Sequence, residues 1–430
     1  MCTAVIVILF VLGYALIACE HVLKVNKAAI ALLMFASTWV VYSMMAPSDL
    51  LHTQLLHHMS DVGEILFFLM GAMTIVEIVD AYGGFKFVSD KLKTRSAKAL
   101  MWRVALVTFF MSALLDNLTT TIVMLMVLSK IVEKRQYRLI YAVCVVLAAN
   151  SGGAFSPIGD VTTIMLWIRG LVSSGSVISH LFVPSLISVL VPLLIMGRWL
   201  RVKFREIDSH LEEKQTHVAS VLKERVVFYV GVGGLVFVPI FKMLTGLPPF
   251  VGVLLVLGIL WVITEIHFDR NYATDPHVIS ILARIDLGTI MFFLGILMTV
   301  GALQEVGVLK QVGQFLDEVS NGNVYVVTGA IGVLSSIVDN VPLVASAMGM
   351  YDASMGMVYE PDGLFWMLLA YCAGVGGSML IIGSAAGVVA MGIEKISFVW
   401  YMKHISWIVF IGYIAGIFAF MLQEFLLTLI

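Results

Sequence analysis

The sequence is poor in charge. Asp, Glu, Lys and Arg make up 13% of its 430 residues, whereas hydrophobic residues make up 60%. A soluble globular domain keeps roughly a quarter of its residues charged, so this composition excludes an ordinary soluble protein. The formal net charge is −2, which excludes the strongly basic surface of a nucleic-acid-binding protein. We therefore expect a lipid bilayer around the chain and no nucleic acid as a partner.

Cysteine is scarce as well. The four cysteines lie apart in apolar runs without paired spacing: Cys2, Cys19, Cys144 and Cys372. This pattern excludes a disulfide framework and a zinc site, and no cofactor is indicated. The first residues lack a basic region and a small-residue cleavage site, so we interpret 3–18 as a membrane span rather than a signal peptide.

Long apolar runs are abundant instead. Windows of about 20 apolar residues mark membrane-spanning helices. They predict an all-α polytopic membrane protein with spans at 3–19, 28–46, 62–80, 139–168, 176–197, 226–243, 250–265, 287–303, 363–394 and 404–427. Two further apolar stretches, 103–132 and 324–350, are interrupted at their centres by polar residues.

The distribution of Lys and Arg predicts the orientation, because these residues favour the cytoplasmic side of short loops. Placing both termini outside puts all basic residues at the inner face except Arg169, Lys242 and Lys310. Both ends of 103–132 are then cytoplasmic, so this stretch is expected to enter and return as a re-entrant hairpin. By the same parity, 324–350 is expected to enter and return from the outer side.

The two halves of the chain repeat one another. Residues 61–76 (DVGEILFFLMGAMTIV) match 286–301 (DLGTIMFFLGILMTVG), with Asp61 and Asp286 lying 225 residues apart. Further matches lie at nearly the same offset: Asp116-Asn117 with Asp339-Asn340, Gly152-Gly153 with Gly376-Gly377, and Gly159 with Gly383. Each half has five spans, an odd number, so the halves are expected to be inverted. Inverted repeats with interrupted helices are typical of secondary transporters.

The repeat defines the expected domains. The first inverted repeat covers 1–197, a cytoplasmic connector covers 198–225, and the second inverted repeat covers 226–430. Each repeat is expected to contain one re-entrant hairpin and one broken helix. These are 103–132 and 139–168 in the first repeat, and 324–350 and 363–394 in the second. Segments 81–98 and 304–320 occupy equivalent places and are expected to lie along the membrane interface.

Four polar interruptions are the candidate site. The hairpin centres are SALLDNLTTT (112–121) and SSIVDNVPLV (335–344), and the breaks in the spans are NSGGAFSPIGDVTT (150–163) and GVGGSMLIIGSAAG (374–387). Broken helices free backbone carbonyls, which are tolerated in a membrane only where protein or an aqueous cavity surrounds them. Together with Asn, Ser and Thr oxygens, such carbonyls suit a small cation.

Three carboxylates lie in these interruptions: Asp116, Asp160 and Asp339. An ionised carboxylate within a membrane is costly and by default marks an ion or proton pathway. The alternative is that each Asp only caps a half-helix, and the two roles can coexist. Inside the predicted spans no Lys or Arg lies near the broken segments, and Arg169 follows the first of them at its outer end. We therefore expect a site with acids and no bases, which favours a cation over a dicarboxylate as substrate.

Other polar residues give weaker indications. Glu64 lies about one turn into its span, and either an outer ion route or a helix-end carboxylate explains it. Glu77 and Asp80 are expected to form an interfacial pair near the cytoplasmic end of that span. The histidines of the predicted outer loop at 47–60 are expected to be solvated rather than pH-sensing: His52, His57 and His58.

These motifs resemble those of the NhaD-type sodium/proton antiporters of the ion transporter superfamily. The likeness covers nearly the whole chain and is sharpest at 112–121, 150–163 and 335–344. It implies that the polar positions of that family correspond here to Glu64, Asp116, Asn117, Asn150, Asp160, Thr162, Thr163, Asp339 and Asn340. Related sodium/dicarboxylate symporters imply a homodimer with a scaffold domain and a transport domain that moves as an elevator.

The leading hypothesis is a Na⁺ (or Li⁺)/H⁺ antiporter of the cell inner membrane, and not an enzyme. Na⁺ is expected at Asp116, Asn117, Asp339 and Asn340. The remaining coordination is assigned to Asp160, Thr162, Thr163 and the carbonyl-rich breaks that include Asn150, Ser151, Gly374 and Ser378. One alternative keeps the fold but changes the cargo to arsenite or a sodium-coupled organic anion. Another is an intramembrane aspartyl protease, although Pro157-Ile158-Gly159-Asp160 lacks the first Gly of the turn that this chemistry requires.

Overall fold

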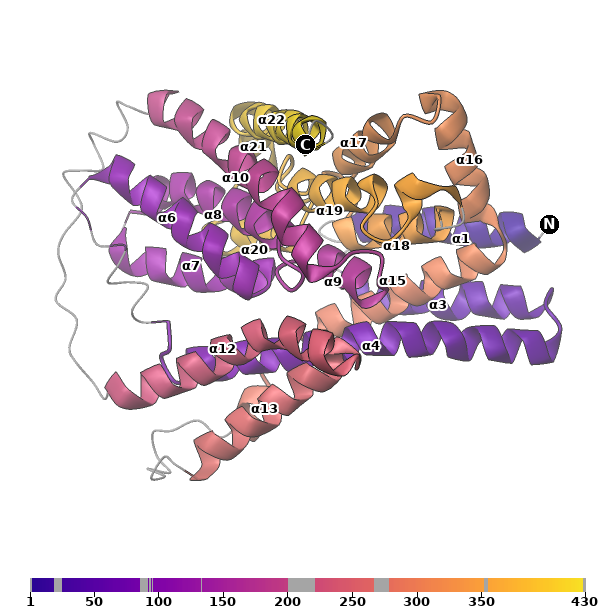
Figure 1. Ribbon diagram of the computed structural model, residues 1–430, viewed down its shortest axis with the longest axis horizontal. Coiled ribbons are helices and arrows are strands. Elements are labelled where there is room, and N and C mark those ends of the chain that lie inside the picture. Colours follow the sequence, from indigo (N-terminus) through magenta and orange to yellow (C-terminus); the bar gives the residue numbers. More distant parts are fainter. Residues whose placement is uncertain are drawn as a thin grey trace.

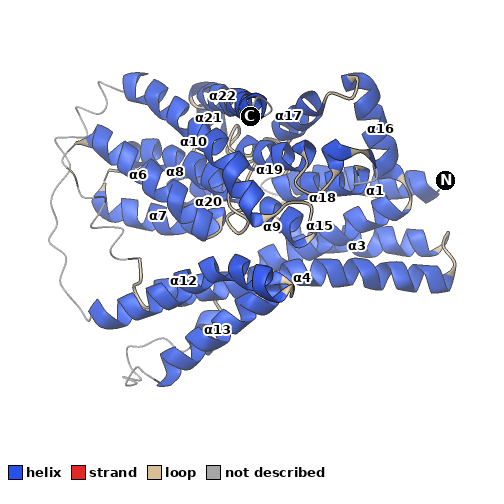
Figure 2. Ribbon diagram, in the orientation of Figure 1, coloured by secondary structure: helices blue, strands red, loops and turns tan. Residues whose placement is uncertain are grey.

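The chain is a helical membrane protein. The computed structural model describes residues 2–18, 25–85, 92, 94, 96–132, 134–199, 221–266, 278–351 and 355–427. Within these ranges every regular element is a helix and no strand occurs (Figure 2). Eight described helices are long and apolar enough to cross a membrane, or nine if one sharply bent pair counts as a span. The expectation of an all-α polytopic protein is confirmed.

The helices of the first half alternate between long spans and shorter segments. They are α1 (Cys2–Ala18), α3 (Lys27–Ser43), α4 (Ser48–Ala81), α6 (Ala97–Leu114), α7 (Asn117–Ile131), α8 (Arg135–Ala154), α9 (Val161–Ile168) and α10 (Ser174–Trp199). The predicted interruptions are thus real breaks: α6 and α7 are separated at 115–116, and α8 and α9 at 155–160.

The second half follows the same plan with additional short helices. It contains α12 (Val221–Thr245), α13 (Pro249–Ile266), α14 (Val278–Leu282), α15 (Leu287–Glu305), α16 (Val308–Ser320), α17 (Val324–Leu334), α18 (Asn340–Met350), the 3₁₀ helix η2 (Met357–Tyr359), α19 (Leu364–Gly376), α20 (Ala385–Glu394), α21 (Phe398–His404) and α22 (Ser406–Leu427). The bent pair is α20 and α21, whose axes differ by 114°.

Short polar side chains fix where these helices begin. At each of several N-termini an Asn, Ser or Asp side chain accepts a hydrogen bond from a backbone N–H of the first turn, and these caps are Asn26, Ser96, Asp116, Asp160, Asp286, Asn323, Asp339, Ser384 and Ser397. Such a cap satisfies a donor that the helix itself leaves unpaired. Inside a membrane protein this matters more, since no bulk water replaces the missing partner.

The prediction of an outer loop at 47–60 is wrong. Helix α4 begins at Ser48 and continues for 34 residues to Ala81. At 1.5 Å per residue it is about 50 Å long, well beyond the roughly 30 Å of a bilayer core. Its polar first turns contain no helix breaker after Pro47, so the helix extends past the apolar segment that hydropathy detects.

Two other predictions fall partly outside the described residues. Most of the connector at 198–225 is not described, although α10 extends to Trp199 and α12 starts at Val221. Segment 81–98 is described only in part, so its interfacial placement stays a prediction. Its counterpart at 304–320 contains α16, whose mixture of apolar and charged faces fits a helix at an interface.

The helices form two groups whose internal contacts correspond. In one group α6 packs on α8 and α17 packs on α19, and each of α7 and α18 contacts the broken helix of the other half. In the other group α13 packs on α4 as α3 packs on α15. Figure 1 shows α12 and α13 on one side of the molecule and α22 on the opposite side, with α6 and α7 toward the left and α17 and α18 toward the right.

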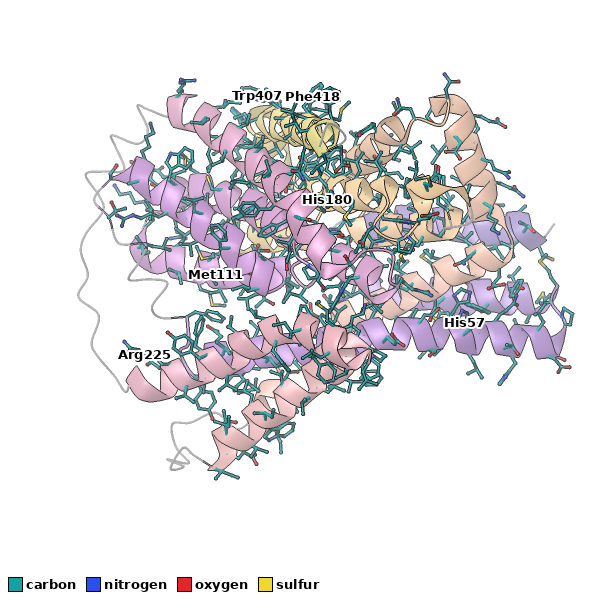
Figure 3. The ribbon with its side chains drawn as sticks, in the orientation of Figure 1. His57, Met111, His180, Arg225, Trp407 and Phe418 are labelled. Carbon is teal, nitrogen blue, oxygen red and sulfur yellow. The ribbon has the colours of Figure 1, made fainter. Side chains whose placement is uncertain are left out.

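The outer surface matches a lipid environment. Figure 3 shows Trp407 and Phe418 along the edge formed by α22, and these side chains are 47% and 64% exposed. Arg225 on α12 and His57 on α4 lie toward opposite ends of the molecule (Figure 3). Exposed apolar side chains on membrane-spanning helices are what contact with lipid favours.

Candidate functional site

One buried carboxylate marks the point where the interrupted helices meet. Asp160 is 1% exposed and caps α9. Its Oδ1 accepts hydrogen bonds from the Thr162 backbone N–H at 3.0 Å and from the Thr162 hydroxyl at 2.9 Å. Its Oδ2 accepts a hydrogen bond from Asn117 Nδ2 at 3.0 Å. The carboxylate is thus oriented by its own helix and by the start of α7.

The second half reaches the same carboxylate. Asn340 Nδ2, at the start of α18, lies 3.5 Å from both carboxylate oxygens of Asp160. Asn117 and Asn340 are a repeat pair, so equivalent residues of the two halves face one group from two helices. The structure thus brings Asn117, Asp160 and Asn340 together.

Asn150 joins the two broken helices. Its Oδ1 accepts a hydrogen bond from Asn117 Nδ2 at 3.1 Å. Its Nδ2 donates to the hydroxyls of Ser378, at 2.9 Å, and of Ser384, at 2.8 Å. All of these side chains are buried. The result is a continuous polar centre of amide, hydroxyl and carboxylate oxygens within an apolar bundle, and we call it the Asp160 centre: Asn117, Asn150, Asp160, Thr162, Asn340, Ser378 and Ser384.

Three predicted residues lie beside the Asp160 centre rather than in it. Ser151 accepts a hydrogen bond from the Ser188 hydroxyl at 3.0 Å and so faces α10. The Thr163 hydroxyl donates to the carbonyl of Ala154 at 3.4 Å, across the break between α8 and α9. Gly374 borders the centre, since a Cβ atom there would lie 3.5 Å from Asp160 Oδ2. These residues shape the break rather than supply the central hydrogen bonds.

The hairpin carboxylates Asp116 and Asp339 are helix caps, as the alternative interpretation predicts. Asp116 accepts hydrogen bonds from the backbone N–H of Thr119 at 2.8 Å and from its hydroxyl at 2.5 Å. Asp339 accepts one from the backbone N–H of Val341 at 3.3 Å. Capping places both carboxylates one residue before the asparagines that contact Asp160.

The expectation of a site with acids and no bases is wrong, because a lysine from outside the predicted spans reaches it. Lys27, the first residue of α3, holds its Nζ 3.6 Å from Asp339 Oδ2. The same Nζ lies 4.3 Å from the centre of the Phe292 ring. The sequence places Lys27 in a basic loop, and only the packing of α3 on α15 brings it to the second hairpin.

Close backbone contacts hold the breaks in place. A Cβ on Gly152 would lie 2.1 Å from the carbonyl oxygen of Phe109, and one on Gly376 would lie 2.2 Å from that of Gly332. Both distances exclude any side chain. The hydroxyls beside them also correspond: Ser112 donates to the carbonyl of Ala149 at 2.6 Å. Its repeat mate, Ser335, donates to that of Ala373 at 2.8 Å.

A cavity of about 250 Å³ lies between α4, α9, α15 and α18. His58 and Arg169 are among its polar lining residues. His58 is 6% exposed and its Nε2 lies 2.9 Å from Glu305 Oε1, so the prediction of a solvated loop histidine is wrong. Arg169 forms an ion pair of 2.6 Å with Asp61.

Glu64 and Glu77 lie away from the Asp160 centre. Glu64 is half-buried on α4 and interacts electrostatically with Lys242 of α12. Glu77 lies near Asp80, as predicted, and its Oε1 lies 4.0 Å from Arg284 Nη1. Neither carboxylate contributes to the hydrogen bonds around Asp160.

Ser384 and Lys27 are the residues that sequence reasoning missed. For Ser384 a signal was present, because it lies 224 residues after Asp160 and is therefore its repeat mate. Like Asp160, it caps the second segment of a broken helix. For Lys27 the sequence holds no comparable signal, since its partner is more than 300 residues away.

Comparisons with known proteins agree with these motifs. A family model described as citrate transporter matches residues 5–369. Sodium/proton antiporter 2 of Arabidopsis thaliana is 46% identical over 418 residues, which are 96% of this chain and 98% of that protein. Sodium/proton antiporter 1 of the same plant is 49% identical over 416 residues, or 96% of this chain and 71% of that protein.

A bacterial relative shows the same similarity at greater distance. The Na⁺/H⁺ antiporter NhaD of Alkalimonas amylolytica is 30% identical over 446 aligned residues, covering 96% of this chain and 89% of that protein. The family resemblance that the motifs indicated is confirmed by these matches. The chain therefore belongs to the citrate transporter family of membrane proteins and, within it, to the NhaD-type sodium/proton antiporters.

Proposed function

We propose that this protein exchanges Na⁺ or Li⁺ for H⁺ across a membrane, with no enzymatic step and no cofactor. The observation that carries the proposal is Asp160, a buried carboxylate at which asparagines from both halves converge. A carboxylate in such surroundings needs either a proton or a cation to offset the loss of hydration. Because one occupant excludes the other, a carrier that moves only when occupied exchanges the two ions.

The transported cation is proposed to bind at the Asp160 centre and its rim. Asp160 supplies the charge, and Asn117, Asn150 and Asn340 supply amide oxygens once their side chains turn toward the ion. Oxygen ligands of this kind suit hard cations. Ser378, Ser384, Thr162 and the carbonyls of the breaks near Ser151, Thr163 and Gly374 complete the set. Asp116 and Asp339 flank the site and raise its negative potential.

The two helix groups are proposed to move relative to one another. The group that contains α6–α10 and α17–α22 carries the Asp160 centre and would be the transport domain. The group of α1, α3, α4, α12, α13 and α15 would be the scaffold. In this proposal the two halves are inverted repeats, α6–α7 and α17–α18 are re-entrant hairpins that open to opposite sides, and the transport domain moves as an elevator.

The cavity between α4, α9, α15 and α18 supports an access route in this scheme. It lies where the two helix groups meet, which is where an elevator exposes its site. We assign it to the outer side because the basic residues predict both termini outside. The cell inner membrane and a homodimer complete the proposal, the latter resting on the resemblance to related symporters.

An organic anion is the second candidate, because the matching family model is described as citrate transporter. A tricarboxylate requires several basic groups in its site. Around the Asp160 centre the described residues supply only Lys27, and its charge faces Asp339. We therefore favour the cation, with arsenite as a further cargo to be tested in the same assay.

The test uses purified protein in proteoliposomes with a pH-sensitive dye inside. A proton gradient is imposed, and Na⁺, Li⁺, K⁺, citrate or arsenite is added in turn. Proton movement driven by Na⁺ or Li⁺ and lost in Asp160→Asn is the expected result. Ser173→Ala, at an exposed position between α9 and α10, is the control. A wild-type protein that is folded but silent to Na⁺ and Li⁺ across alkaline pH would overturn the assignment.

A further inference from the structure

The two hairpin tips hold their carboxylates differently. At the first tip, both oxygens of Asp116 accept hydrogen bonds from Thr119, the third residue of the helix that Asp116 caps. At the second tip the equivalent third residue is Pro342, which has neither an N–H nor a hydroxyl. Asp339 instead accepts a hydrogen bond from the N–H of Val341, and only its Oδ1 takes part. Its Oδ2 is left for a partner from another part of the protein.

Lys27 is that partner. It approaches from α3, a helix of the other group, and its Nζ lies 3.6 Å from Asp339 Oδ2. The Lys27 and Asp339 side chains are 25% and 17% exposed, so water screens their attraction only in part. Phe292 of α15 lies beneath the ammonium group and favours a cation there.

The equivalent contact of the other helix pair, between α4 and α13, joins two aromatic rings. Phe67, the repeat mate of Phe292, contacts the ring of Phe250 at a centroid distance of 6.4 Å. Lys27 at the start of α3 therefore stands where α13, the equivalent helix of the second half, has the ring of Phe250. Helix formation does not require a lysine there, since α13 begins without one. The asymmetry places a single fixed positive charge beside a candidate ion site, on the opposite side of the boundary between the helix groups.

We propose that Lys27 is a tethered counter-cation that pairs with Asp339 when the ion site is empty and is displaced when Na⁺ binds. Asp339 directly precedes Asn340, whose side chain faces Asp160, so two ionised carboxylates at this site would repel one another. Pairing with Lys27 neutralises one of the two carboxylates in the empty carrier. A Na⁺ ion near Asp339 repels the ammonium group and weakens the contact between α3 and the hairpin. Lys27 is thus a positioning residue that couples occupancy to the boundary between the helix groups.

This inference rests on the proposed exchange function, and the dye assay tests both separately. In Lys27→Gln, Na⁺ no longer competes with a tethered charge, so the half-saturating Na⁺ concentration at alkaline pH should fall at least about fivefold. Lys27→Arg should keep the wild-type value, because it keeps the charge. Lys310→Gln, an exposed lysine on α16, is the matched control and should change nothing.

A double-mutant cycle separates pairing from a structural role. In an Asp339→Asn background the Lys27→Gln change should leave the half-saturating Na⁺ concentration as it is, because the partner charge is gone. Stabilisation of each purified variant by Na⁺ in a thermal melt gives the same affinities without transport, including for variants of low activity. An unchanged Na⁺ affinity in Lys27→Gln, beside an active wild type, would overturn the inference and leave the exchange function standing. A silent wild type would overturn both.

Discussion

The two halves of this protein make several equivalent backbone contacts and differ in the chemistry of their side chains. Gly152 and Gly376 make the same contact with a neighbouring carbonyl, and Ser112 and Ser335 make the same hydrogen bond. The caps of the second broken segments differ, since the first half has Asp160 where the second has Ser384. The repeat therefore builds two similar frames, and only one of them supplies the central charge.

This division explains how a symmetric fold holds an asymmetric site. A second carboxylate at position 384 would face Asn150 and, through it, the same polar centre. Two unpaired charges so close in a low dielectric would repel strongly. A hydroxyl at Ser384 keeps the cap and the hydrogen bond without adding charge.

Replacing the central carboxylate should abolish exchange, whereas replacing its repeat mate should not. Asp160→Asn keeps the shape of the side chain but removes the charge that both ions need, so Na⁺-driven proton flux should fall by more than about 100-fold. Ser384→Ala removes the hydrogen bond from Asn150 and the N-cap hydrogen bond from the Gly387 N–H, each worth about 1 kcal/mol. It should leave at least about a tenth of the flux. Dye-loaded proteoliposomes measure both, and equal loss in the two variants would contradict the comparison.

Alanine at Gly152 and alanine at Gly376 should destabilise the protein to a similar extent. In Gly152→Ala and Gly376→Ala the new Cβ would overlap a carbonyl oxygen, and overpacking of this kind costs about 1–3 kcal/mol or more. Both variants should therefore melt at lower temperature by similar amounts. Gly258→Ala on α13, where a Cβ meets nothing within 4 Å, is the control. A large difference between the first two would mean that the frames are not equivalent.

Replacing Asn117 should change the Na⁺ affinity more than replacing its repeat mate, Asn340. Asn117 donates to Asp160 at 3.0 Å and to Asn150 at 3.1 Å, whereas Asn340 lies 3.5 Å from Asp160. Asn117→Ala should raise the half-saturating Na⁺ concentration more than Asn340→Ala, with at least about a tenfold rise for the former. The dye assay over a range of Na⁺ concentrations gives the ratio. The reverse order would place the cation nearer the second hairpin than we propose.

Sequence reasoning recovered most of the fold because hydropathy and helix breaks are local signals. The interruptions at 115–116 and 155–160 were readable from polar and glycine residues alone, and so was the presence of Asp160 at one of them. The extent of α4 was not, because its first turns are polar helix rather than apolar span. The burial of His58 could not be predicted either, because it depends on the packing of α4 against α15, where His58 contacts Glu305.

The electrostatic environment of the site was the least predictable part. Lys27 meets Asp339 only because α3 lies along α15, and no spacing in the sequence relates the two. Ser384, in contrast, could have been found by applying the 224-residue offset to Asp160 as well as to the glycines. Repeat symmetry thus predicts positions, whereas charge pairing across the fold requires the structure.

The smallest expected effect concerns the two caps themselves. Thr119→Val removes the hydroxyl that donates to Asp116 but keeps the backbone N–H that forms the cap. The free energy of unfolding should therefore fall by only about 1 kcal/mol, which a thermal melt would measure.

At the second tip, Pro342→Thr introduces an N–H and a hydroxyl at the position equivalent to Thr119. These groups would compete with Lys27 for the Asp339 carboxylate. The half-saturating Na⁺ concentration should then fall modestly, in the direction expected for Lys27→Gln but less. A rise in the half-saturating Na⁺ concentration would instead show that Na⁺ affinity depends on the proline itself and not on competition for the Asp339 carboxylate.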